Sequence, residues 1–212
     1  MIKLNKNVFS KGNVAFKDNE CRFENILVKK IDGNIKFDTN NADYKFNAHI
    51  GEDLLTAQAK VKGNFIDFVF DIPKLNSNSL IIDNELRAKR YLPIISTSGK
   101  YKGKLDEIEY NRINLVAKVL SSDPLSKIKY NSGDININNG KVVIKNLKGF
   151  INAPQNIFTV DLKVDDAFSI KPNFNGNVKV KIPDLSLYNE ILSSDILPEK
   201  IKNSLKNYEF KN

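Results

Sequence analysis

The chain has 212 residues, with 33 basic and 25 acidic side chains, one His, one Cys and no Trp, and a formal net charge of +8. One Cys and one His cannot supply the four ligands of a structural zinc site or the two thiols of a disulfide, and any histidine-based catalytic relay would depend on His49 alone. The length allows one or two domains with a sizeable core.

The positive charge is spread along the chain and forms no basic block. The 33 basic residues comprise 29 Lys and four Arg, and the Lys residues alternate with apolar positions. A nucleic-acid surface would concentrate its charge and favour Arg for bidentate contacts to bases. We therefore expect no nucleic-acid partner, and steeply salt-dependent binding to DNA or RNA would reverse this expectation.

Apolar and polar residues alternate with a period of two along most of the chain, which predicts strands with one wet face. The residues opposite the apolar ones are mostly Lys, Asn, Asp and Thr. In chain order, the predicted apolar faces are Ile35 and Phe37; Ala42, Tyr44, Phe46, Ala48 and Ile50; Leu55, Ala57, Ala59 and Val61; Ile135 and Ile137; Phe158, Val160, Leu162 and Val164; and Val178, Val180 and Ile182.

The glycines are predicted to mark polar turns that lead into these strands. Most are followed two residues later by an apolar side chain. The glycines at the start of such steps are Gly12, Gly33, Gly63, Gly103, Gly133 and Gly176.

Two similar halves are predicted, residues 1–95 and 96–212. In each half a strand that follows a Gly-Asn step ends at an Ile-Pro pair, at Ile72 and at Ile182, because Pro cannot donate to the sheet ladder. Helix is expected to be minor, with two or three short pieces near 84–92, 185–192 and 198–208.

No residue pattern indicates catalysis. His49 lies on the polar face of its strand and is expected to be solvated, and Cys21 has no resolving Cys nearby. The acidic groups at 106–109 and 165–166 are expected to be a solvated strand face or loop and a turn, not a pair facing one cleft. No Walker loop or dinucleotide fingerprint is present. We therefore predict a non-enzymatic chain with no catalytic residues, no metal site and no cofactor.

The apolar stripe is the remaining candidate for function. A long sheet with few helices to cover it would leave a curved, open apolar groove, which suits acyl chains because they need area and no polar partners. The fold class predicted is mainly β, a long curved antiparallel sheet forming such a groove. The predicted lipid-binding residues are the apolar faces named above, without Ala42, Ile50 and Ile182.

The sequence also resembles the repeat units of AsmA-like and TamB-like envelope proteins. The resemblance lies in the segments 33–37, 62–65 and 71–75, and in the hairpin at 132–142 that passes into 147–150. It implies a bridge-like β-groove that carries phospholipids between the inner and outer membranes of a diderm bacterium, or that helps to assemble outer-membrane proteins. It further implies a periplasmic location, phospholipid acyl chains and inner- and outer-membrane proteins as partners, and membrane association through segments outside this chain.

The start and end of the chain favour a fragment of a longer protein. Residues 1–8 contain no apolar signal-peptide core, no apolar run approaches the about 20 residues of a membrane-spanning helix, and residues 208–212 end without a cap. The main alternative is an extracellular β-sandwich for adhesion or binding, with two sheets packed face to face and function in the loops.

Overall fold

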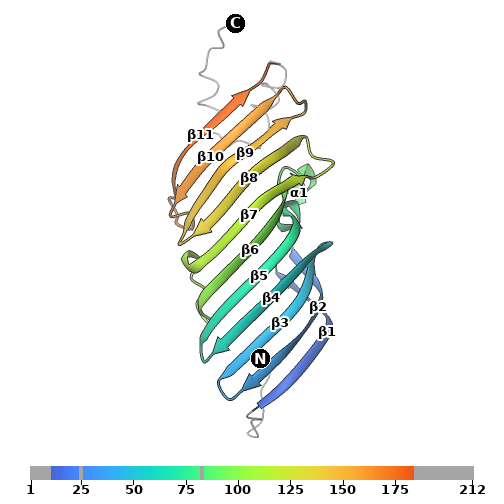
Figure 1. The fold of residues 1–212 in the computed structure, drawn as a ribbon, viewed down its shortest axis with the longest axis vertical. Helices are drawn as coiled ribbons and strands as arrows, with labels where there is room; N and C mark the ends of the chain where they lie inside the picture. The colour runs from blue at the N-terminus through green and yellow to red at the C-terminus, as the bar shows by residue number, and fades with distance from the viewer. Residues whose placement is uncertain (1–10, 24–25, 82–83, 184–212) are drawn as a thin grey trace.

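The computed structural model describes residues 11–23, 26–81 and 84–183, which form one antiparallel sheet of eleven strands. Each strand pairs with its neighbours in the sequence, and β1 does not pair with β11, so the sheet is open (Figure 1). The prediction of a mainly β chain with a long antiparallel sheet is confirmed. The strands are β1 (Lys11–Phe23), β2 (Ile26–Asp38), β3 (Asn41–Ile50), β4 (Asp53–Lys62), β5 (Phe65–Asn76), β6 (Pro93–Lys104), β7 (Ile113–Ser122), β8 (Ile128–Asn138), β9 (Lys141–Ile151), β10 (Ile157–Asp165) and β11 (Asn173–Lys181).

Tight turns keep the strands in sequence order. The turns after β3, β4 and β8 contain Gly51, Gly63 and Gly140 with positive φ angles of 63°, 56° and 74°. Asn139 precedes Gly140 with a φ of 50°, so this Asn-Gly pair has the backbone that a two-residue hairpin requires. At these three turns the next strand along the chain is therefore the nearest partner available.

The prediction that glycines mark turns is right for Gly63 and wrong for the other five positions. Gly12, Gly33, Gly103, Gly133 and Gly176 all lie inside strands.

These five glycines, together with Gly99 and Gly149, leave space that is filled by neighbouring atoms and that a Cβ atom would occupy. A Cβ at Gly99 would overlap the ring of Phe70 on the neighbouring strand, and a Cβ at Gly149 would overlap Phe158 and the carbonyl oxygen of Lys129. Glycine in a strand often marks such a close approach. At Gly12 and Gly33, as at Gly99 and Gly149, the space is taken by an aromatic ring of a neighbouring strand.

The expectation of two or three short helices is not borne out among the described residues. The described helical segments are α1 (Asn84–Lys89), with six residues, and the 3₁₀ turns η1 (Ser77–Leu80) and η2 (Tyr110–Arg112). The predicted helices at 185–192 and 198–208 lie outside the described residues. Inside the described range, alternation of period two dominates and leaves few residues for helix.

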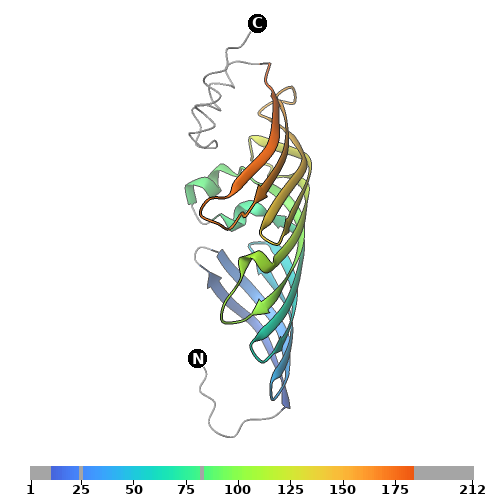
Figure 2. The ribbon, with the colours of Figure 1, turned by 90° about the vertical axis from the view of Figure 1, so that its left-hand side faces the viewer.

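The sheet is curved, and the connection between β5 and β6 lies on its concave side (Figure 2). We call this connection, residues 77–92, the β5–β6 connection; it contains η1 and α1. The predicted boundary between units 1–95 and 96–212 falls inside β6, and hydrogen bonding continues from β5 through β6 to β7. The division into two similar halves stays a prediction.

Candidate functional site

One row of directly paired residues crosses the whole sheet and contains only apolar side chains and glycine. Each member pairs with the next across neighbouring strands, so all of them point to the same side. We call this side the inner face. From β1 to β11 the row is Phe16, Gly33, Phe46, Ala57, Phe70, Gly99, Leu115, Ile137, Val142, Val164 and Phe174.

The inner face is the concave side of the sheet. The Tyr130 ring packs edge-on against the inner-face Phe158, with 5.7 Å between centroids. The Tyr130 hydroxyl donates a hydrogen bond of 2.7 Å to the carbonyl oxygen of Tyr91 in the β5–β6 connection. Because that connection lies on the concave side (Figure 2), so do Tyr130 and Phe158.

All 17 predicted binding residues lie on the inner face, as the strand registers show. They come from β2, β3, β4, β8, β10 and β11. They are Ile35, Phe37, Tyr44, Phe46, Ala48, Leu55, Ala57, Ala59, Val61, Ile135, Ile137, Phe158, Val160, Leu162, Val164, Val178 and Val180.

Sequence reasoning missed the inner-face residues of β1, β5, β7 and β9, which join the predicted groups into one surface. In β5 and β7, apolar and polar residues alternate in the sequence, and this pattern could have identified the inner-face residues of these two strands. The missed residues include Val14, Phe16, Ile66, Phe68, Phe70, Leu115, Ala117, Val142 and Ile144.

Most large inner-face side chains are only partly buried. Small residues such as Ala48, Ala57 and Ala59 are buried between their larger neighbours, whereas Phe46 and Val160 are of intermediate exposure. On β11, Val178 and Val180 are 65% and 50% exposed. A side chain in a closed core would instead be almost wholly buried. Among the described residues, the inner face is thus a largely uncovered apolar surface.

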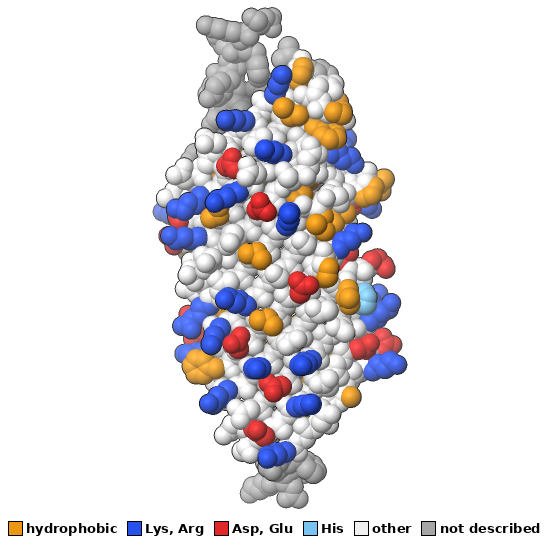
Figure 3. All heavy atoms as spheres, in the orientation of Figure 1, with side chains coloured by type: hydrophobic (Ala, Val, Ile, Leu, Met, Phe, Trp, Pro, Cys, Tyr) orange, Lys and Arg blue, Asp and Glu red, His pale blue; other side chains and the backbone are white. Residues whose placement is uncertain are grey.

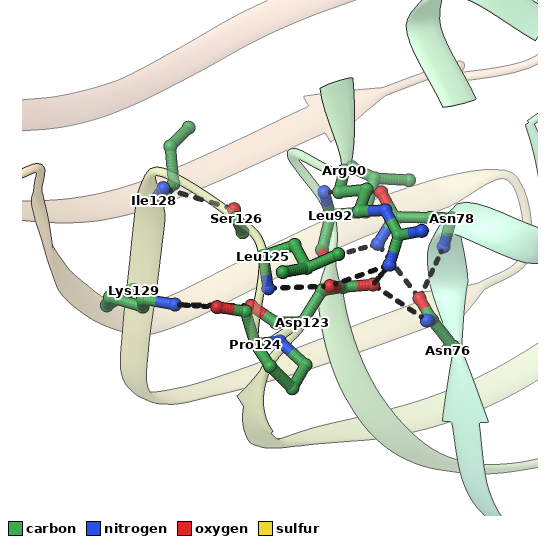
Figure 4. Close-up of polar contacts among 10 residues, drawn as sticks. All are labelled: Asn76, Asn78, Arg90, Leu92, Asp123, Pro124, Leu125, Ser126, Ile128 and Lys129. Atoms are coloured by element: carbon green, nitrogen blue, oxygen red, sulfur yellow. Dashed lines mark hydrogen bonds and ion pairs between the residues drawn. The ribbon is translucent and has the colours of Figure 1, made fainter. Parts of the chain in front are cut away.

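Where the β5–β6 connection meets the sheet, a polar cluster fastens it (Figure 4). Asn78 closes the base of the connection, because its Nδ2 donates to the Leu92 carbonyl and its Oδ1 accepts from the Leu92 amide, both at 2.9 Å. Asp123, in the loop after β7, accepts from Asn76 Nδ2 at 3.1 Å and pairs with Arg90 Nη1 at 3.2 Å. The cluster therefore ties both ends of the connection to the β7–β8 loop.

Asp123 is the most deeply buried acid of this cluster, with 2% of its surface exposed. Burial by itself raises the pKa of its carboxyl group, but hydrogen bonds from the Leu125 amide and Asn76, together with Arg90, lower the pKa below its usual value. The carboxylate is therefore ionised at neutral pH and satisfied by these donors.

Burial raises the pKa of the Tyr130 phenol to about 12 from a usual value of 10.0. At a pH between these two pKa values, the tyrosine is mostly ionised in the unfolded chain and mostly neutral in the folded protein. Its stabilising contribution is therefore complete below pH 10 and is lost as the pH rises towards 12, by at most about 3 kcal/mol.

We expect Tyr130→Phe to cost about 1 kcal/mol near pH 8, because it removes the hydrogen bond to Tyr91. The variant should also lose less stability than the wild type when the pH is raised from 8 to 11. Urea unfolding of both proteins at the two pH values measures this. An equal loss in both proteins would contradict the assignment of this titration to Tyr130.

The opposite, outer face carries the charges. One row pairs Lys36, Asp43, Lys60, Asp67 and Lys102 across β2 to β6, so opposite charges face each other. Basic and acidic side chains are interspersed over this face with only scattered hydrophobic residues (Figure 3). The net positive charge is therefore not concentrated in a patch on this face.

The candidate chemical groups do not assemble into a catalytic centre. Residues 105–109 form a loop, in which Glu109 pairs with Arg112 at 2.8 Å, and Asp165 pairs with Lys163 at 3.1 Å at the end of β10. Cys21 is an exposed free thiol. In the part of the chain that the structure describes, no three His, Cys, Asp or Glu residues are grouped to hold a metal ion.

The expectation that His49 lies solvated on the polar face is right for the face, which it shares with Lys29, but not for the full solvation. Its side chain is half-buried, and its Nδ1 is fully buried without a hydrogen-bond partner among the described residues. His49 is the penultimate residue of β3, close to where that strand meets the β5–β6 connection, and this contact is not visible in local alternation.

Comparisons with family models, with curated proteins and with solved structures find no match to this chain. The resemblance to AsmA-like and TamB-like proteins therefore stays a prediction. None of the described helices is long and apolar enough to cross a membrane.

Proposed function

We propose that this chain is a non-enzymatic segment of a cell-envelope protein whose inner face forms an open groove for the acyl chains of phospholipids. The carrying observation is the apolar row that crosses all eleven strands on the concave side. Acyl chains need a continuous apolar surface and no directed hydrogen bonds, which is what this row offers.

The contrast between the two faces supports the proposal. Soluble proteins rarely leave a contiguous apolar surface of this extent uncovered, unless it binds a partner, a ligand or a membrane. The row from Phe16 to Phe174 contains no polar side chain, so an acyl chain can lie along it from strand to strand. Phospholipid transport between membranes, or help in outer-membrane assembly, is the activity that this surface would serve.

An extracellular β-sandwich is the competing proposal. It needs a second sheet over the inner face, whereas the described residues form one sheet. The groove proposal requires no such cover.

The direct test is lipid capture. The purified, delipidated chain is incubated with phospholipid vesicles, separated from them and measured by native mass spectrometry. We expect complexes that retain one or more phospholipid molecules. A protein that emerges without lipid at every vesicle concentration would refute the groove.

A further inference from the structure

A cleft of about 450 Å³ lies where the ends of β2 and β3 meet the β5–β6 connection. Its walls combine two kinds of side chain. The apolar ones are Ile26, Leu27 and Ile50, and the cationic ones are Lys29, Lys30 and Arg87.

The apolar part of this cleft continues the inner face. Ile50 follows Tyr44, Phe46 and Ala48 on the same side of β3, and it pairs with Val28 on β2. An acyl chain lying along the inner face of β3 would therefore reach the cleft at Ile50.

The polar part of the cleft has an excess of positive charge. Three cationic side chains line it against one carboxylate, Glu52. Neither Lys29 nor Lys30 forms an ion pair with a described carboxylate. The guanidinium group of Arg87 is hydrogen-bonded within the connection, because its Nε and Nη2 both donate to the Ile81 carbonyl oxygen. Arg87 is thus held by the connection, and two lysines without a carboxylate partner among the described residues line the same cleft.

His49 also lines this cleft, although it pairs with Lys29 and therefore lies on the opposite side of β3 from Ile50. A buried polar atom without a partner costs free energy, so natural proteins rarely leave one. The buried Nδ1 of His49 has no hydrogen-bond partner among the described residues. Because this nitrogen is fully enclosed, a ligand in the cleft does not reach it, and the charge available to a ligand comes from Lys29, Lys30 and Arg87.

We propose that this cleft binds the anionic phosphate headgroup of a lipid whose acyl chain lies along the inner face from Ile50 onward. This inference rests on the proposed function, because it assigns the headgroup end of the same groove. Lys29, Lys30 and Arg87 supply the charge, and the apolar wall at Ile26 and Leu27 ties the site to lipids instead of free anions.

The test measures binding of three probes to the full chain by isothermal titration calorimetry: dodecyl phosphate and dodecyl maltoside, both as monomers, and inorganic phosphate. We expect dodecyl phosphate to bind about tenfold or more tighter than dodecyl maltoside, because charge-assisted hydrogen bonds are added to the same apolar contact. Inorganic phosphate should bind more weakly than either detergent.

The decisive variant is Lys29→Gln with Lys30→Asn. Asn suits position 30 because Lys30 has a positive φ of 49°. The variant should lose about tenfold in affinity for dodecyl phosphate and keep its affinity for dodecyl maltoside, which also shows that it is folded. The control, Lys179→Gln with Lys181→Gln, removes the same charge from exposed positions on β11 and should change neither affinity.

Each unfavourable outcome has a distinct meaning. Equal affinities for the two detergents, or equal losses in variant and control, would overturn the headgroup site and leave the groove intact. Tight binding of inorganic phosphate would show a free-anion site and also overturn the lipid assignment. Failure of both detergents to bind would overturn the proposed groove itself, and the headgroup site with it.

Discussion

Phe46→Asp is expected to reduce acyl-chain binding by about 100-fold or more, while the protein stays folded. Phe46 belongs to the apolar row and pairs with Ala57 and Gly33, so an aspartate there would place a charge under the bound chain. Burying an unpaired carboxylate costs several kcal/mol, which exceeds what the lost apolar contact alone would cost.

The cost to stability should be smaller than for a closed core. Phe46 is only partly buried, so the new carboxylate can remain hydrated when no lipid is bound. We expect a loss of about 1–2 kcal/mol in the free energy of unfolding, against about 3–5 kcal/mol for removing a fully buried Phe. Urea unfolding and binding of a fluorescent fatty acid measure the two effects.

Val160→Asp repeats this test on β10, far from β3 in the sheet. Asn47→Asp is the matched control, because it adds the same charge at an exposed outer-face position next to Phe46. The control should bind lipid as the wild type does. If both inner-face variants unfold, the inner face is a closed core and the groove proposal fails.

Asp123→Asn is expected to destabilise the fold by about 2–3 kcal/mol. The carboxylate accepts hydrogen bonds from Asn76 and the Leu125 amide and pairs with Arg90, and an amide nitrogen in its place would face these donors. Removing one partner of a buried polar cluster leaves the others unsatisfied. The Arg90 side chain is 44% exposed, so screening limits its share of the loss.

The stability due to Asp123 should also depend on pH. Because the folded protein lowers the pKa of this carboxyl group, the stabilisation is present above its unfolded value of 3.8 and is lost as the pH falls through the lower, folded value. Asp123→Asn should therefore flatten the acid side of the stability profile. Asp106→Asn, in the loop after β6, is the control and should stay within about 0.5 kcal/mol of the wild type.

The strands could be predicted from the sequence because alternation is a local property. In 42–50 and 158–164, each apolar residue is separated from the next by one polar residue, and this determines both the strand and its two faces. The glycines could not be interpreted the same way. Gly99 and Gly149 lie under Phe70 and Phe158, and such cross-strand packing depends on register, which a single strand does not contain.

The polar cluster and the cleft at the ends of β2 and β3 lay beyond prediction for a related reason. Asn76 and Asp123 are 47 residues apart, and His49 meets Ser79 and Arg87 only at the cleft. In the sequence these residues look like ordinary polar side chains of loops and strand ends. Only the path of the β5–β6 connection over the concave side brings them together (Figures 2 and 4).

The sequence by itself determined that this chain forms wet-faced strands and lacks the grouped His and Cys residues on which most catalytic and metal sites depend. Its charge was correctly attributed to solvated strand faces, since residue types and their period are local facts. The tertiary structure decided that these strands form one open sheet in sequence order, with every predicted apolar face on its concave side. Strand order and register arise from contacts between residues distant in the chain, so no local pattern could contain them.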